Sequence, residues 1–167
     1  MEDKVKRAKN LCVFGIVFAL ISFVVYFVLL QTGVFFDTDD ADFGEGIAMA
    51  ITIVYVAPFY GGSAILAVVS YICNIVASKK MLNGECLQNG RLITAIVFNS
   101  IALALCAVAL FFGITLNIPQ GIWVGVYFIF LIITLVATCK QKGRVKELLF
   151  LQAEREKSAV VDEAALS

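Results

Sequence analysis

The sequence predicts an all-α, polytopic integral membrane protein with four transmembrane helices in two antiparallel hairpins and both termini in the cytoplasm. Composition is the first observation: of 167 residues, 61% are hydrophobic and 16% are charged. Ordinary soluble domains contain about 45 to 50% apolar and about 25% charged residues, so a globule of this size cannot bury the apolar excess. Lipid therefore has to cover part of the surface.

The positions of the charges are the second observation. All 13 Lys and Arg fall in three blocks, at 4–9, 79–91 and 140–157, while residues 10–78 carry only five acids and residues 92–139 carry no charge. Lys and Arg are enriched in short cytoplasmic loops, so the three blocks and both termini are predicted to be cytoplasmic. Basic residues near a membrane also attract anionic headgroups. Every inner loop does this to some degree, so the pattern alone does not indicate a specific lipid site.

Each gap between the blocks is long enough for two crossings, because one crossing of a hydrocarbon core of about 30 Å needs about 20 apolar residues. The four spans are expected at 11–30, 47–78, 92–116 and 119–139. The first run is longer than the apolar region of a signal peptide, which has about 7 to 15 residues, so it is expected to be retained. The halves share one plan of span, outer turn and span, which leaves a parallel duplication as an open alternative.

Span two is longer than one crossing requires. Residues 47–78 would form a helix of about 48 Å at 1.5 Å per residue. Pro58 lies about 20 residues before its cytoplasmic end, and proline lacks an amide donor and clashes with the preceding turn. Either the helix kinks at Pro58, or residues 47–57 form a separate outer piece. The functional interpretation is that Pro58, Gly61, Gly62 and Ser63 form a hinge that lines a site, as in discontinuous transporter helices.

The connection at 31–46 is acidic and is predicted to lie outside. Its four Asp would cost more than about 10 kcal/mol near the centre of a span. Asp42, with Glu45 three residues later, matches a capping box that starts the next helix. The spacing of the acids fits no register of the EF-hand loop, so no metal site is expected, with a looser divalent site as the alternative.

The connection at 116–119 is short and contains Asn-Ile-Pro, a sequence suited to capping and starting a helix, so spans three and four are expected to be neighbours. Gly121 and Gly125 form a GxxxG pattern, which lets helices approach closely. The pattern predicts packing, either within the bundle or between two copies. Trp123 and Tyr127 are suited to the outer membrane interface.

After Cys139 the chain becomes polar. Residues 140–167 are expected to form a short cytoplasmic helix, which either continues span four past Gly143 or lies in the interface. The last ten residues are expected to form a loose tail.

The sequence contains few side chains that are suited to catalysis. The chain has no His, and its spans have no ionisable Asp, Glu, Lys or Arg away from their ends, whereas proton and ion pathways usually contain such groups. The five Cys have no metal-ligand spacing. We therefore expect no enzymatic activity, no cofactor and no nucleic-acid partner. Polar residues inside the spans remain as candidates: Ser63, Ser70, Asn74, Asn99 and Ser100. An interhelical hydrogen bond is expected for Asn99, with a ligand pocket as the alternative.

Two functions fit these features. The first is a non-enzymatic accessory or partner-binding membrane subunit, because the sequence has apolar surfaces and no cluster of reactive side chains. The second is a small transporter or channel subunit that acts as an oligomer, with its site near the Pro58–Ser63 break, Asn74 and Asn99. The expected partners are the lipid bilayer and either another membrane protein or further copies of the chain. No Asn-x-Ser/Thr acceptor occurs, which fits a bacterial cytoplasmic membrane.

Overall fold

The computed structural model describes residues 2–32, 43–82, 89–116 and 118–165, with side chains in 5–32, 46–82, 90–116 and 118–145. The described chain is helical throughout apart from Thr32 and contains no strand. Its elements are α1 (Glu2–Gln31), α2 (Phe43–Ile51), a π-helical turn η1 (Thr52–Val56), α3 (Ala57–Leu82), α4 (Asn89–Leu116) and α5 (Ile118–Ala165). Four helical stretches are long and apolar enough to cross a membrane: Val5–Gln31, Gly46–Leu82, Gly90–Leu116 and Ile118–Val145. The prediction of an all-helical chain with four such helices is confirmed.

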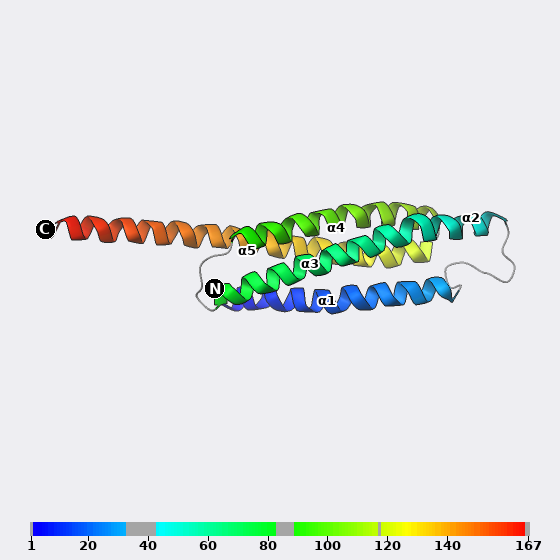
Figure 1. The fold of residues 1–167 in the computed structure, drawn as a ribbon, viewed down its shortest axis with the longest axis horizontal. Helices are drawn as coiled ribbons and strands as arrows, with labels where there is room; N and C mark the ends of the chain where they lie inside the picture. The colour runs from blue at the N-terminus through cyan, green and yellow to red at the C-terminus, as the bar shows by residue number, and fades with distance from the viewer. Residues whose placement is uncertain (1, 33–42, 83–88, 117, 166–167) are drawn as a thin grey trace.

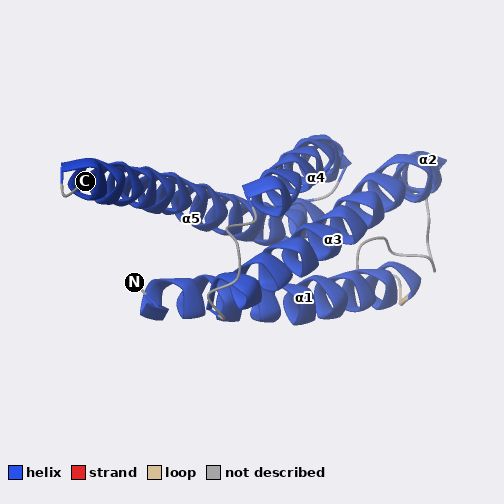
Figure 2. Ribbon diagram, turned by 60° about the vertical axis from the view of Figure 1, so that its left-hand side comes forward, coloured by secondary structure: helices blue, strands red, loops and turns tan. Residues whose placement is uncertain are grey.

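The helices form one elongated bundle in which α3 occupies the middle. It packs along α1 on one side and along α4 on the other, while α5 packs along α4 and also contacts α1 (Figures 1 and 2). This central position explains why α3 has buried residues on two sides, whereas α1, α4 and α5 each bury a single stripe.

The single stripes follow helical spacing. On α1 the buried residues recur every three or four positions from Cys12 to Leu30, and on α4 they do so from Leu92 to Gly113. Alternating three- and four-residue steps keep one face of a helix turned towards its neighbour, as in a coiled coil. Apolar residues occur on every side of each span, so mean hydropathy alone does not reveal which face this is.

Residue size and polarity distinguish the inside of the bundle from its surface. Large aliphatic and aromatic side chains cover the outside, with Ile118 71% exposed, Ile65 67% and Phe111 66%. The buried faces instead contain mostly Ala, Gly, Ser, Thr, Asn, Gln and Tyr, together with a few Leu, Val and Cys. A water-soluble domain would bury the first group, so this arrangement fits a protein whose surface is solvated by lipid.

Glycine permits the closest contact between α4 and α5. A Cβ atom on Gly121 would lie 2.6 Å from Ile114 Cγ1 and 2.9 Å from Ile114 Cα, so the two backbones approach where Gly121 has no side chain. Gly125 faces α4 less tightly, since its Cβ would lie 3.6 Å from Leu110 Cδ1. The GxxxG residues therefore pack within the bundle, which is one of the two alternatives that the sequence left open.

The C-terminal region confirms one of the two alternatives for its helix and differs from the expectation of a loose tail. Helix α5 has 48 residues and continues through Gly143 to Ala165, extending beyond the bundle (Figure 1). At 1.5 Å per residue it is about 70 Å long, more than twice the thickness of a hydrocarbon core. Of the two alternatives for this helix, the structure therefore shows the continuation of span four past Gly143, and residues 158–165 are helical where a loose tail was expected. No Gly or Pro occurs between Arg144 and Ala165 to end the helix.

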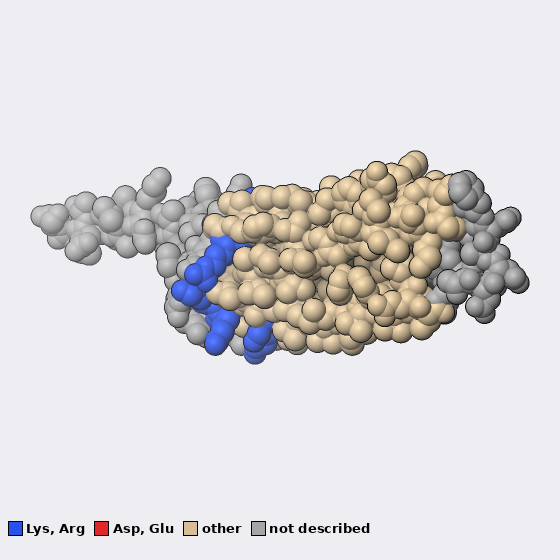
Figure 3. Space-filling view, turned by 45° about the vertical axis from the view of Figure 1, so that its right-hand side comes forward, with Lys and Arg blue, Asp and Glu red and all other residues tan. Residues whose placement is uncertain are grey.

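The described Lys and Arg side chains gather at one end of the bundle. They come from the start of α1, the end of α3, the start of α4 and the segment of α5 that begins at Lys140. Figure 3 shows them at one end of the visible face, while the rest of its described surface carries no charge. Described side chains from all three basic blocks of the sequence therefore lie at one end of the bundle, which we call the basic end.

Candidate functional site: a buried polar core and an apolar groove

A directional hydrogen-bond chain crosses the core near the basic end. Gln141 Nε2 on α5 donates to Ser78 Oγ on α3 at 2.8 Å, and Ser78 Oγ donates to Asn74 Oδ1 at 3.2 Å. Asn74 Nδ2 in turn donates to Thr138 Oγ1 on α5 at 3.0 Å, and Thr138 Oγ1 donates to the carbonyl of Thr134 at 2.9 Å. These bonds join α3 to α5.

Thr134 continues the polar core towards the middle of the bundle. Its hydroxyl donates to the carbonyl of Leu131 at 2.9 Å and accepts from Asn99 Nδ2 on α4 at 3.2 Å. The hydroxyl of Tyr71 on α3 lies 3.2 Å from the same oxygen. Because the single Thr134 hydrogen goes to Leu131, Tyr71 is the donor in this pair. One threonine therefore connects three helices.

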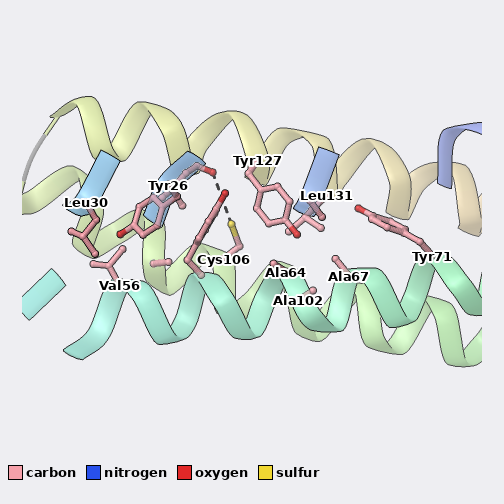
Figure 4. Close-up of a cluster of buried hydrophobic side chains, with 14 of the residues drawn as sticks. Tyr26, Leu30, Val56, Ala64, Ala67, Tyr71, Ala102, Cys106, Tyr127 and Leu131 are labelled. Carbon is pink, nitrogen blue, oxygen red and sulfur yellow. Dashed lines mark hydrogen bonds between the residues drawn. The ribbon is translucent and has the colours of Figure 1, made fainter. Parts of the chain in front are cut away.

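Tyrosines dominate the half of the core farther from the basic end. The hydroxyls of Ser22 and Tyr60 are 2.6 Å apart, and Gln120 Nε2 donates to the Tyr26 hydroxyl at 2.7 Å. The ring centroids of Tyr26 and Tyr60 lie 4.7 Å apart, and those of Tyr60 and Tyr127 lie 5.3 Å apart. Figure 4 shows Tyr26 and Tyr127 between the helices. Tyr127 is fully buried inside the bundle rather than on its surface.

Several buried polar atoms have no hydrogen-bond partner among the described residues. They are Thr52 Oγ1, Asn99 Oδ1, Gln120 Oε1 and Gln141 Oε1. Ser63 Oγ, Tyr127 OH and Trp123 Nε1 form no well-aligned hydrogen bond, but Ser63 interacts with Tyr127, and Trp123 interacts with Tyr60. Each unpaired buried group carries a desolvation cost of about 1 to 3 kcal/mol. They lie at both ends of the core and in its middle.

The sequence candidates separate into two groups. Asn74 and Asn99 belong to the hydrogen-bonded core, and Ser63 is fully buried beside it. Ser70 makes a single bond, donating to the carbonyl of Ala95 at 2.7 Å. Ser100, by contrast, is exposed on α4 and does not join the others. The proposed cap is not tested, because Asp42 and the Glu45 side chain lie outside the described part of the chain.

The helix irregularity lies just before Pro58. The chain remains helical from Phe43 to Leu82, with the π turn η1 at Thr52–Val56. The amide of Ala57 donates to the carbonyl of Thr52, five residues earlier. Pro58 has no amide hydrogen for the carbonyl of Val54 and would crowd it in a regular α-helix. The wider π turn accommodates both effects, so the chain continues through Pro58 as a helix.

An apolar groove, which we call the lateral groove, runs between α1 and the α2–α3 helix. Its wider part has a volume of about 700 Å³ and is lined by Phe23, Phe27, Leu30, Gln31, Met49, Ile53, Ala57, Pro58, Gly61, Gly62 and Ile65. A narrower part of about 270 Å³ shares Phe23, Gly61 and Ile65 and continues to Val69. Pro58, Gly61 and Gly62 thus line a groove rather than the polar core.

The sequence analysis did not identify much of the polar core. Tyr26, Tyr60, Tyr71 and Gln120 were not singled out, although each carries a core hydrogen bond. A usable signal existed in span one, where small or polar residues recur every three or four positions at Gly15, Ala19, Ser22 and Tyr26. The partners on the other helices follow only from the packing.

The described Cys residues form no disulfide. Cys12 and Cys106 are buried, Cys73 is half-buried and Cys139 is exposed. Within the part of the chain that the structure describes, no three His, Cys, Asp or Glu side chains lie close enough to hold a metal ion.

The bundle has four long apolar helices, large apolar side chains on its surface and polar side chains in its interior. These features are compatible with one class of protein, the multi-pass integral membrane proteins. Comparison of the chain with protein-family models, curated proteins and solved structures yields no match.

Proposed function

We propose that the protein is a non-enzymatic, partner-binding membrane subunit whose lateral groove receives an apolar transmembrane helix of another protein. The groove is the observation that carries this proposal. From Met49 to Val69 it follows about 20 residues of helix, or about 30 Å, which matches the length of one membrane crossing. A partner helix could therefore lie along it from one side of the hydrocarbon core to the other.

Small residues on the floor of the groove support a helix as its occupant. Ala57, Gly61 and Ala64 recur at helical spacing along α3 and line the groove, with the ring of Phe23 from α1 packed against Gly61. Small residues in this pattern let two helix backbones approach closely in lipid, where van der Waals packing drives association. The surrounding Phe23, Phe27 and Ile65 provide apolar walls for the partner's side chains.

The orientation of the subunit follows from its charges. We place the basic end and both termini in the cytoplasm, with the connections at 31–46 and 116–119 outside. The convergence of the Lys and Arg side chains at one end supports this orientation, because cytoplasmic segments are enriched in these residues.

Photo-crosslinking in native membranes tests the groove. A benzoylphenylalanine placed at Ile53, Ile65 or Val69 is expected to yield a discrete protein adduct. The same group at Val97 or Val126, exposed positions that do not line the lateral groove, is expected to yield none. An Ile65→Trp substitution fills the groove and should reduce the adduct formed from position 53.

Native mass spectrometry in mild detergent, which reports bound partners and oligomeric state, provides the second part of this test. A heterologous adduct identifies a partner subunit, and an adduct with a differently tagged copy identifies a homo-oligomer. A strictly monomeric chain that crosslinks only to lipid would refute the partner-binding function.

A small transporter or channel subunit is the second candidate. The polar interior favours it, especially the unpaired Asn99 Oδ1 and the fully buried Ser63 in the middle of the core. A core that opens to water would hydrate these atoms. Ser63→Cys in a chain free of other Cys should then react with a membrane-impermeant, water-soluble thiol reagent, whereas a permanently dry core predicts no reaction.

A further inference from the structure

A second pocket lies at the basic end, between α1 and α5. It has a volume of about 320 Å³, and its lining includes the cationic side chains of Arg7, Lys140 and Arg144. The charges come from two facing helices. Arg7 lies on α1, one turn before Leu11, and Lys140 lies one turn before Arg144 on α5. Three positive charges from two helices therefore border one pocket.

The pocket also contains a buried polar group that is held in place. Gln141 lines it and is 3% exposed. The only hydrogen of the Ser78 hydroxyl goes to Asn74 Oδ1, so Ser78 can only accept from Gln141. This fixes the amide of Gln141 with Nε2 towards Ser78. Its Oε1 is itself buried and has no partner among the described residues, so a ligand in the pocket has to reach this atom at the pocket wall.

Charge and hydrogen bonding together select a ligand chemistry. Arg and Lys suit a phosphate, which Arg can bind with two parallel hydrogen bonds. The Gln141 Oε1 is an acceptor and requires a donor, such as a hydroxyl or an ammonium group. Leu11 and Ala137 supply an apolar wall on the side towards the spans.

The geometry points to a specific site for an anionic phospholipid whose phosphate carries a headgroup with a free hydroxyl. The phosphate lies among Arg7, Lys140 and Arg144, the hydroxyl donates to Gln141, and the acyl chains leave along Leu11 towards the hydrocarbon region. Basic pockets between membrane helices are suited to such headgroups. The site is separate from the lateral groove and does not depend on the proposed partner.

The test is a lipid titration of the full-length chain in detergent, followed by native mass spectrometry. Phosphatidylglycerol has the required charge and hydroxyls, and phosphatidylcholine has the same phosphate without net charge. The wild type is expected to bind phosphatidylglycerol more tightly. The double substitution Arg7→Gln and Arg144→Gln should weaken that binding about 30-fold, the effect expected for two charges near a membrane surface.

A matched control removes two basic charges outside the pocket. Lys79→Gln with Arg91→Gln should weaken binding less than about threefold, because neither residue lines the pocket. Arg7→Lys with Arg144→Lys retains the charges and should keep most of the affinity. Thermal melts of all variants, followed by circular dichroism, separate loss of binding from loss of fold. Equal weakening by the two Gln pairs would overturn the site in favour of diffuse attraction.

Phosphatidylmethanol tests the role of Gln141, because it has one negative charge and no headgroup hydroxyl. The wild type should prefer phosphatidylglycerol over it, and Gln141→Leu should abolish that preference while leaving the attraction to charge. The absence of a preference in the wild type would refute the hydroxyl contact. Soluble glycerol 3-phosphate distinguishes the source of the ligand: if it binds as tightly as phosphatidylglycerol, the ligand is a soluble phosphate ester and the lipid site is wrong.

Discussion

Thr134 joins three helices through one oxygen. It accepts hydrogen bonds from Tyr71 on α3 and Asn99 on α4 while donating within α5. Inside a membrane bundle neither donor can obtain water when its partner is lost. Polar contacts of this kind give lipid-solvated helices a defined packing that apolar side chains alone do not provide, because lipid competes equally well for apolar surface.

Thr134→Val should therefore destabilise the bundle, because valine keeps the shape but leaves both donors unpaired. The expected loss is about 1 to 3 kcal/mol, measured as the free energy of unfolding in a detergent titration followed by circular dichroism. Asn99→Leu removes one of the two bonds and should cost less, about 0.6 to 2 kcal/mol. Thr94→Val is the control, since its exposed hydroxyl bonds only to Gly90 on its own helix. An equal or greater stability for Thr134→Val would contradict this role.

Gly121 provides a second test at the level of one residue. Gly121→Ala would place a methyl group 2.9 Å from Ile114 Cα, so α4 and α5 must separate. Overpacking of this kind costs about 1 to 3 kcal/mol. Gly143→Ala on the same helix has no atom within 4 Å of the new Cβ and should be neutral or stabilising. The same unfolding assay applies, and similar stabilities for the two variants would argue against the close contact.

At the level of elements, η1 determines which face of α2 turns towards the bundle. A π turn inserts one extra residue into a helix, so the segment before the turn is rotated by about 100° relative to the segment after it. In the present register Thr52 and Val56 are buried, while Ile53, Val54 and Tyr55 are exposed. The turn thus sets which residues of the outer segment border the lateral groove.

Pro58→Ala should let η1 return to a regular α-helix, because an alanine amide can bond to the carbonyl of Val54. Spin labels at Ile47 and Ile114 are expected to show a changed distance distribution when Pro58 is replaced. Labels at Ile72 and Val97 report on α3 and α4 beyond the turn and should be unaffected. An unchanged first distance would show that packing, rather than the proline, maintains the π turn.

At the level of the whole molecule, the charges and the helix ends imply one orientation in the membrane. Thr32→Cys, at the end of α1 opposite the basic end, should react on intact cells with a membrane-impermeant maleimide. Gly143→Cys, at the basic end, should react only after the membrane is opened. Both variants are made in a chain free of other Cys. The reverse labelling pattern would overturn the cytoplasmic placement of the termini.

The sequence by itself determined the helical class and the four long apolar helices, because hydropathy and charge are properties of local sequence and one crossing needs only a certain length. It also drew attention to Asn74, Asn99 and the region of Pro58. Only the tertiary structure decided which face of each helix is inside, because nearly every side chain in a span is apolar and lipid accepts all of them. That choice depends on close approach at Gly121 and on pairing between distant residues, such as Tyr26 with Gln120 and Tyr71 with Thr134. The same long-range packing brings Arg7 beside Arg144 and creates the lateral groove, so both proposed binding sites follow from the packing rather than from any local motif.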